Sequence, residues 1–171
     1  MIFTIDTLPS LNKYLPQLIT NYISMFSESP FNNPNITNEV AKEFFINTFI
    51  NGLIFVNTYS STDIIVGFRT VIKSEKFKDF DKLNLDDNSI YLSCLWISKN
   101  LRNTSLGNNL MTYSLSIVRK NFNPKSIYVR TRNDTPGILH LLKSKGFTQI
   151  NKYPVIINNQ ELELLLHKLE F

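Results

Sequence analysis

The feature that most constrains the fold is a run of mostly apolar residues, 89–98, which leads into a polar loop and then a helical pattern. A strand that is apolar on both faces is typical of the centre of a sheet whose two sides are covered. The chain has 171 residues, which is enough for one such sheet with its covering helices. We therefore predict one mixed α/β (α+β) domain that spans residues 1–171.

Hydrophobic periodicity places other elements around this strand. Strands are predicted at residues 1–6, 53–58, 64–73, 126–131, 147–157 and 160–169, and helices at residues 8–25, from 37 or 38 to about 50, 106–119 and 135–145. We expect Thr37 or Asn38 to cap the second helix, and Thr135 to cap the last one, which has Pro136 at its first position. Residues 73–88 read as a charged, mobile connection. The order β-α-α-β-β-β-α-β-α-β-β predicts a mixed sheet with helices on both faces.

Composition excludes several classes of protein. Cys94 is the only cysteine, so no internal disulfide can form, and with two histidines, His140 and His167, we expect no metal site. No segment reaches the ~20 apolar residues of a membrane-spanning helix, and the N-terminus lacks the basic region of a signal peptide. We therefore expect a cytoplasmic protein with no membrane partner.

Charge is distributed unevenly along the chain. Residues 1–98 carry seven Lys or Arg and ten Asp or Glu, whereas residues 99–171 carry eleven and four. This asymmetry indicates that the second half contacts an anion, such as a phosphorylated cofactor, a nucleic acid or an anionic surface; a solvated basic face is the alternative. Residues 106–118 contain no basic side chain, so no basic helix face is available for nucleic acid, and we expect no such partner.

The junction between the apolar strand and the next helix can form an anion pocket. Backbone N–H groups of a loop and of the first helical turn converge on one point, where the helix dipole adds about half a positive charge. Lys99 and Arg102 add positive charge to the same loop. A strand, loop and helix in this order therefore indicate either a phosphate site or an ordinary connection here.

These residues resemble a known family, the GCN5-related N-acetyltransferases (GNAT). The acetyl-CoA loop of that family reads Arg/Gln-x-x-Gly-x-Gly/Ala, and the chain has Arg102-Asn103-Thr104-Ser105-Leu106-Gly107, with the aliphatic Ile97 five residues before the arginine. Residues 135–147 are similar to the helix of the family that closes into a strand at Gly-Phe, and residues 65–68 are similar to its hairpin strand. The resemblance covers most of residues 53–157.

The resemblance implies an acetyl-CoA-dependent N-acetyltransferase in which an amine attacks the thioester directly. It implies acetyl-CoA as co-substrate, a small-molecule amine as acceptor, and a monomer or homodimer. The cofactor-binding residues that it implies are Leu95, Trp96, Ile97, Arg102, Asn103, Thr104, Ser105, Leu106, Gly107, Asn108, Asn133 and Thr135. The backbone near residues 95–97 would polarise the thioester carbonyl.

Three positions depart from the pattern of the family. Ser105 replaces the first loop glycine, which would cost about 1–2 kcal/mol if that residue needs a left-handed backbone; its hydroxyl could instead bind a phosphate or cap the helix. Thr135 stands where the family usually has Asn, with Asn133 as a possible substitute for a contact to the pantetheine arm. Leu142 stands where the family often has the tyrosine that protonates the leaving thiolate, and leucine cannot do so.

The catalytic base is not identified by the pattern. Residues 89–98 contain no carboxylate, and Glu28 is a candidate base that would act through water, with Asp86 or Asp87 as others. The acidic stretch Asp79, Asp81, Asp86 and Asp87 could attract a cationic amine, although a solvated loop is the commoner meaning. A buried, inert role is expected for Cys94 and a core role for the side chain of Trp96. The alternative function is a catalytically degenerate domain that binds or senses acetyl-CoA.

Overall fold

The computed structural model describes residues 1–28, 31, 33, 35–59, 62–157 and 160–171. Its elements are β1 (Ile2–Ile5), α1 (Leu8–Ser27), α2 (Asn38–Asn51), β2 (Gly52–Thr58), β3 (Ile65–Lys73), the 3-10 helix η1 (Ser74–Lys76), α3 (Phe80–Leu83), β4 (Ser89–Ile97), the 3-10 helix η2 (Lys99–Leu101), α4 (Leu106–Phe122), β5 (Ser126–Arg132), α5 (Pro136–Ser144), β6 (Thr148–Ile157) and β7 (Gln160–Glu170). All predicted strands and helices are present, with shifts of one to three residues at their ends.

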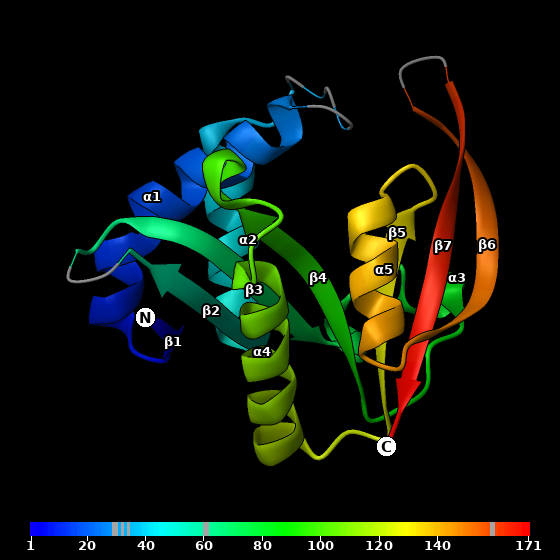
Figure 1. Cartoon of the computed structure of the whole chain (residues 1–171). Helices are drawn as coiled ribbons and strands as arrows, with labels where there is room; N and C mark the ends of the chain where they lie inside the picture. The colour runs from blue at the N-terminus through cyan, green and yellow to red at the C-terminus, as the bar shows by residue number, and fades with distance from the viewer. Residues whose placement is uncertain (29–30, 32, 34, 60–61, 158–159) are drawn as a thin grey trace.

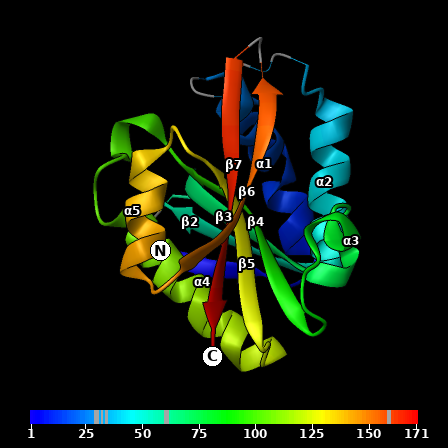
Figure 2. The ribbon, with the colours of Figure 1, turned by 90° about the vertical axis from the view of Figure 1, so that its right-hand side faces the viewer.

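One seven-stranded sheet has the order β1-β2-β3-β4-β5-β7-β6. Neighbouring strands are antiparallel, except for the parallel pair of β4 and β5. The helices α1 and α2 cover one face, and α4 and α5 cover the other (Figures 1 and 2). The predicted mixed sheet with helices on both faces is therefore confirmed.

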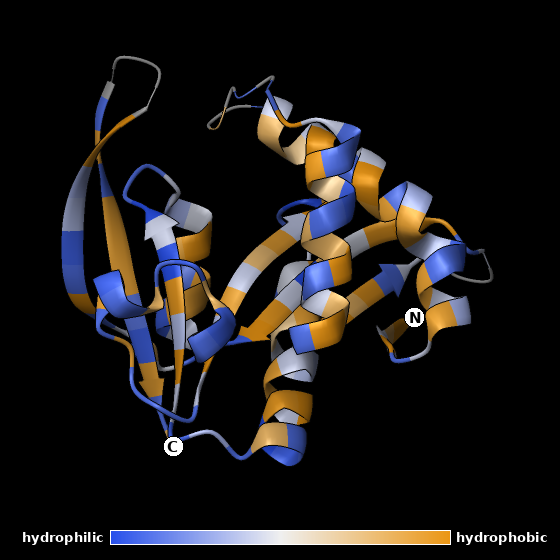
Figure 3. Ribbon diagram, turned by 180° about the vertical axis from the view of Figure 1, so that it is seen from behind, coloured by the Kyte–Doolittle hydropathy of each residue, from blue (hydrophilic) through white to orange (hydrophobic). Residues whose placement is uncertain are grey.

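Each face of the sheet has its own core. Leu18 of α1, Phe45 of α2 and Phe68 of β3 are fully buried on the first face, and Leu110 of α4 and Ile127 of β5 are fully buried on the second. Seen from the side of α1 and α2, these helices carry both hydrophobic and hydrophilic residues, as expected for helices that cover a sheet (Figure 3).

Two of the predicted helix starts behave differently. Thr37 caps α2, because its Oγ1 accepts a hydrogen bond from the N–H of Val40 at 3.3 Å. Thr135 precedes α5, but its hydroxyl donates to the carbonyl oxygen of Arg132 at 2.6 Å and makes no capping bond. The hydroxyl stabilises the tight connection from β5 instead. Thr135 thus occupies the predicted N-cap position, but its side chain makes no capping bond.

Residues 73–88 are more ordered than the sequence indicates. They form η1 and α3, and the ring of Phe77 stacks on Tyr91 of β4 with a centroid distance of 3.8 Å. Leu83 and Leu85 are buried in the same small hydrophobic cluster as Phe77 and Tyr91. The segment is therefore not the loose connection that the sequence predicted, because four apolar side chains among the charges pack it: Phe77, Phe80, Leu83 and Leu85.

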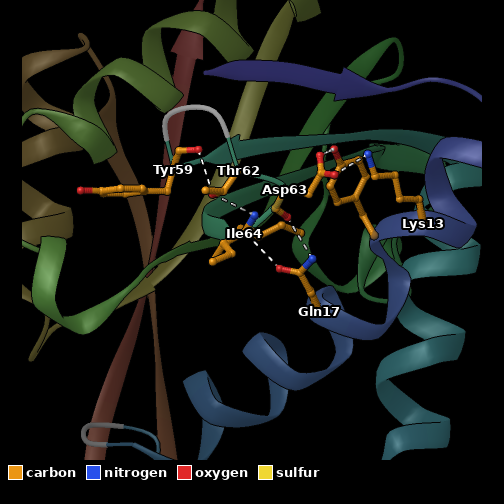
Figure 4. A network of polar contacts seen from close by, with 8 residues as sticks. Lys13, Gln17, Tyr59, Thr62, Asp63 and Ile64 are labelled. Atoms are coloured by element: carbon orange, nitrogen blue, oxygen red, sulfur yellow. Dashed lines mark hydrogen bonds and ion pairs between the residues drawn. The ribbon is translucent and has the colours of Figure 1, made fainter.

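A polar network fastens α1 to the β2–β3 connection (Figure 4). Gln17 donates to the carbonyl of Asp63 at 3.0 Å and accepts from the N–H of Ile65, also at 3.0 Å. Tyr14 and Lys13 both contact the Asp63 carboxylate, at 2.9 Å and 2.8 Å. The network fixes α1 against β3.

None of the helices in the described parts of the chain combines the length and hydrophobicity needed to cross a membrane.

Candidate active site

The parallel strands β4 and β5 are hydrogen bonded to each other over only part of their length. Residues 89–92 of β4 pair with residues 126–129 of β5, and the pairing stops there although both strands continue (Figure 1). We call these paired segments the paired end. Residues 93–97 of β4 and 130–132 of β5 form the open end, where the facing backbone groups have no strand partner and are available to another molecule.

A β-bulge in β4 begins where the pairing with β5 stops. On β3, Thr70 lies opposite Cys94 and Val71 lies opposite Leu92, so Ser93 is an extra residue. The hydroxyls of Thr70 and Ser93 are 2.9 Å apart and hydrogen bonded. A bulge bends a strand and re-aims the residues that follow, which explains why Leu92 and Leu95 both pack toward α4.

The backbone of β4 presents two N–H groups to the open end. The N–H of Ser98 donates to the carbonyl of Val66 on β3 at 2.9 Å. Because N–H directions alternate along a strand, the N–H of Trp96 also faces β3, whereas those of Leu95 and Ile97 face the open end. The indole of Trp96 packs on Phe68 with a ring distance of 5.6 Å and belongs to the first core, as expected.

The loop after β4 has a left-handed residue at Asn103 and not at Ser105. Asn103 has φ 62°, whereas Ser105 has φ −68° and ψ −4°, in the ordinary helical region. The serine that replaces glycine therefore causes no backbone strain, and asparagine tolerates the left-handed conformation better than most residues. Thr104 braces the turn, since its hydroxyl donates to Leu101 at 2.7 Å and accepts from the N–H of Leu106 at 3.3 Å.

The N-terminus of α4 lies beside the end of β4. A Cβ on Gly107 would lie 3.8 Å from a side-chain carbon of Ile97, which is an ordinary contact distance. Ser105 makes no capping bond to the helix backbone, and the N–H groups of the first turn of a helix have no acceptor within the helix. Together with the helix dipole, the amides of Gly107 and Asn108 fit a phosphate group.

Arg102 connects this loop to the end of α1. Its Nε donates to the carbonyl of Ile97 at 3.1 Å, and its Nη2 forms an ion pair with Glu28 at 2.8 Å. Desolvation alone raises the pKa of Glu28, but hydrogen bonds from Arg102 and Ser24 outweigh it, so that the pKa is lowered. The structure thus brings together two residues that the sequence placed in separate roles.

Comparison with known proteins identifies the fold. No family model matches the sequence, and no curated protein matches it in sequence. A ribosomal-protein-alanine N-acetyltransferase from Brucella melitensis superimposes with a TM-score of 0.77 at 15% identity, over 99% of both chains. A putative acetyltransferase from Salmonella typhimurium, solved with its cofactor acetyl-CoA, gives 0.76 at 11% identity, over 99% of this chain and 94% of that one. An acetyltransferase of the GNAT family from Streptococcus pneumoniae gives 0.74 at 13% identity, over 100% of this chain and 99% of that one.

The chain has the GNAT fold. This confirms the fold expected from the sequence. Of the two segments that resembled the family, residues 102–107 form the end of the loop after β4 and the start of α4, and residues 135–147 span α5.

Sequence reasoning missed Arg132, which ends β5 in this GNAT fold. Its guanidinium donates to both carboxylate oxygens of Asp134, at 2.9 Å and 2.6 Å, and lies 5.5 Å from the ring centre of Phe31. The residue is 5% exposed. Through Phe31, Arg132 therefore joins the end of β5 to the connection between α1 and α2. An arginine followed two residues later by an aspartate was the only local signal for this contact.

Asn133 and Thr135 hold the β5–α5 connection. The N–H of Asn133 donates to the carbonyl of Glu163 on β7 at 3.0 Å, and its side-chain oxygen accepts from the N–H of Glu163 at 3.3 Å. The hydroxyl of Thr135 is engaged with Arg132. Their contact with a pantetheine arm stays a prediction, and these bonds leave the side-chain NH2 of Asn133 and the lone pairs of the Thr135 hydroxyl for it.

Leu142 and Cys94 are core residues. Leu142 is 1% exposed in the second core beside Phe147, so its position offers no proton donor to the open end. Burial raises the pKa of Cys94 to about 12, and its thiol donates to the sulfur of Met25 at 3.6 Å. Burial and the raised pKa both disfavour the thiolate, which supports the buried, inert role that the sequence indicated.

Two carboxylates of the acidic stretch are engaged in ion pairs. Asp86 forms an ion pair with Lys168 at 2.9 Å and accepts from the hydroxyl of Ser126 at 3.0 Å, at the start of β5. Asp79 forms an ion pair with Arg130, the first open-end residue of β5, at 3.1 Å. Because Asp86 lies at the opposite end of β4 from Ile97, the expected role of Asp86 as a base or an attractor of amines gains no support.

Proposed function

We propose that this protein is a member of the GNAT family that uses acetyl-CoA to acetylate a small amine, by direct attack of the amine on the thioester. The observation that carries the proposal is the open end of the β4–β5 pair, which lies directly beside the N-terminus of α4. The GNAT fold supports it, and so does the acetyl-CoA bound in a structure of the same fold from Salmonella typhimurium.

The chain supplies two kinds of donor to an acetyl-CoA molecule in this position. The amides of Gly107 and Asn108 would hold the diphosphate at the start of α4. The N–H of Leu95 or Ile97 would polarise the thioester carbonyl, and a well-placed donor of this kind stabilises the oxyanion of the transition state. The cofactor supplies the activated acetyl group and its thiol leaving group.

Glu28 is the candidate base on the acceptor side. Its lowered pKa and its ion pair with Arg102 keep the carboxylate charged but make it a weak proton acceptor. We assign it the task of fixing the end of α1 against the loop of Arg102, together with orientation of a water that takes the proton. No residue is assigned to protonate the thiolate, since a thiol with a pKa near 8.5 leaves readily at neutral pH.

A second candidate function is a degenerate domain that binds acetyl-CoA without turnover. The specific observation that favours it is Leu142, which occupies the usual position of the tyrosine and is buried in the core. This function shares the cofactor site and differs only in catalysis.

Two measurements test these functions in sequence. Calorimetric titration with acetyl-CoA tests the site, and no binding at millimolar acetyl-CoA would refute both functions. Release of the CoA thiol is then followed with a panel of small amines, from aliphatic monoamines to amino acid amides and aminoglycosides. Amine-dependent thiol release supports the acetyltransferase, whereas binding without release across the panel supports the degenerate domain.

A further inference from the structure

A lysine connects the two helices that flank the candidate cofactor site. Lys145 directly follows α5, and its Nζ donates to Oγ1 of Thr112 on α4 at 2.7 Å. Both helices lie on the same face of the sheet (Figure 1). Lys145 is half-buried, and within the described residues it has no carboxylate at ion-pair distance. Its positive charge is therefore available to an anion that lies beside the Lys145–Thr112 bond.

The ammonium group of Lys145 lies at a defined height along α4. The hydroxyl of Thr112 also donates to the carbonyl of Asn108, at 2.9 Å. Asn108 belongs to the first turn of the helix, so Lys145 is held about one helical turn, ~5.4 Å, from the amides that fit a diphosphate. The site thus has two positive regions, one from the helix N-terminus and one from a lysine, on the same side of α4.

The backbone that carries Lys145 is fixed. The N–H of Lys145 donates to the carbonyl of Leu142 at 3.0 Å, and the N–H of Phe147 donates to the same carbonyl at 3.1 Å. Gly146 between them has φ 83°, a left-handed conformation that glycine adopts without strain. Because both ends of the side chain are held, little conformational entropy remains to be lost when an anion binds.

Resting on the proposed function, we propose that Lys145 binds the 3′-phosphate of coenzyme A and makes the protein select acetyl-CoA over its 3′-dephospho analogue. Coenzyme A carries the 3′-phosphate on the same ribose whose 5′ oxygen bears the diphosphate, which matches two positive regions about one turn apart. An ammonium group has three donors. Lys145 therefore keeps its bond to Thr112 while it donates to the phosphate.

The test compares two ligands and three proteins. Dissociation constants of CoA and of 3′-dephospho-CoA are measured by calorimetry, at one low ionic strength, for the wild type, Lys145→Met and Lys143→Met. Lys143 is the matched control, because it is an exposed lysine of α5 two residues away. Thermal unfolding of each variant verifies that the protein is folded.

The expected result is a loss of discrimination in one variant only. The wild type binds CoA about tenfold more tightly than 3′-dephospho-CoA, a difference of about 1.4 kcal/mol. In Lys145→Met the affinity for CoA falls to the level of the affinity for 3′-dephospho-CoA. The affinity of this variant for 3′-dephospho-CoA differs from that of the wild type by less than about twofold. Lys143→Met binds both ligands as the wild type does.

Other outcomes overturn the proposal. Equal affinity of the wild type for both ligands, or an unchanged ratio in Lys145→Met, shows that the 3′-phosphate does not contact Lys145. An equal loss for both ligands in that variant shows a structural effect. If the wild type binds neither ligand, the proposed function fails and this inference fails with it, whereas tight binding of both ligands without discrimination overturns the inference alone.

Discussion

The two ends of the β4–β5 pair differ in what satisfies their backbone and side chains. At the paired end, residues 89–92 and 126–129 form a parallel ladder, and Asp86 ties its start to Lys168 of β7. At the open end the ladder is missing, and Arg102 and Arg132 instead hold the two strand ends to residues of the α1–α2 region. The same two strands thus stabilise each other at the paired end and leave backbone groups for a ligand at the open end.

The bulge at Ser93 accounts for this change. It begins where the pairing ends, and it turns the alternation of β4 so that Leu92 and Leu95 face the same core. We therefore expect substitutions at the paired end to lower the free energy of unfolding and to leave the affinity for acetyl-CoA intact. Substitutions at the open end should lower the affinity for acetyl-CoA and leave the free energy of unfolding intact.

The largest expected effect is on stability at the paired end. Leu92→Ala removes a side chain that is 2% exposed, and the cavity should lower the free energy of unfolding by about 2–5 kcal/mol. Denaturant unfolding measures this loss. The affinity of the folded variant for acetyl-CoA should change less than about threefold, and a loss of affinity as large as the loss of stability would erase the distinction between the ends.

The next effect is on binding at the open end. Ser105→Glu puts a negative charge where the phosphates are expected, and the affinity for acetyl-CoA should fall on the order of 100-fold, or about 2.7 kcal/mol. Ser116→Glu is the control, because it adds the same charge to an exposed position about three turns further along α4. Calorimetry and thermal unfolding are measured together. Unchanged affinity in Ser105→Glu would mean that the phosphates bind elsewhere.

A smaller effect is expected at Glu28. Glu28→Gln keeps a side chain that Arg102 can bond, so kcat should fall less than about tenfold with unchanged affinity for acetyl-CoA. A true general base would cost about 10²–10⁴ in kcat and change the pH profile. The measurement is thiol release against pH with an active amine. A fall of kcat in the larger range, with a lost acidic limb, would make Glu28 the base.

The smallest effect is on the pH dependence of stability at His167. This residue of β7 lies opposite Val129, the last residue of β5 that pairs with β4. The Nε2 of His167 is 3.1 Å from the hydroxyl of Thr131. Burial lowers its pKa, so the unfolded state takes up a proton first as the pH falls. Stability should be complete above about pH 6.5 and decline below it.

Unfolding of the His167→Gln variant measures this slope. The variant should lose the part of the acid decline that His167 causes, whereas His140→Gln, at an exposed position, should keep it. An identical pH dependence in all three proteins would contradict the burial of a neutral histidine at this place.

The sequence predicts those parts of the fold and the site that depend on neighbours along the chain. The apolar run at residues 89–98 indicated a central strand, and Thr37 predicted a helix start that the structure confirms. The position of the loop before α4 also followed from local pattern. The bulge could not be predicted in this way, because a strand that is apolar on both faces has no alternation that an inserted residue would interrupt.

Contacts between distant residues could not be predicted in this way. Arg102 and Glu28 are 74 positions apart, and Lys145 and Thr112 are 33 apart. No local pattern reports such pairs, because they depend on how helices and loops pack on the sheet. The left-handed residue of the loop is Asn103, whereas the family pattern had raised that conformation only as a condition at Ser105.

Hydrogen exchange at single amides, followed by NMR with and without acetyl-CoA, shows whether the open end holds the cofactor. We expect acetyl-CoA to slow exchange at Leu95, Ile97, Gly107 and Asn108 and to leave residues 89–92 unchanged. Protection confined to another surface, or no protection at saturating acetyl-CoA, would contradict the assignment of the open end as the cofactor site.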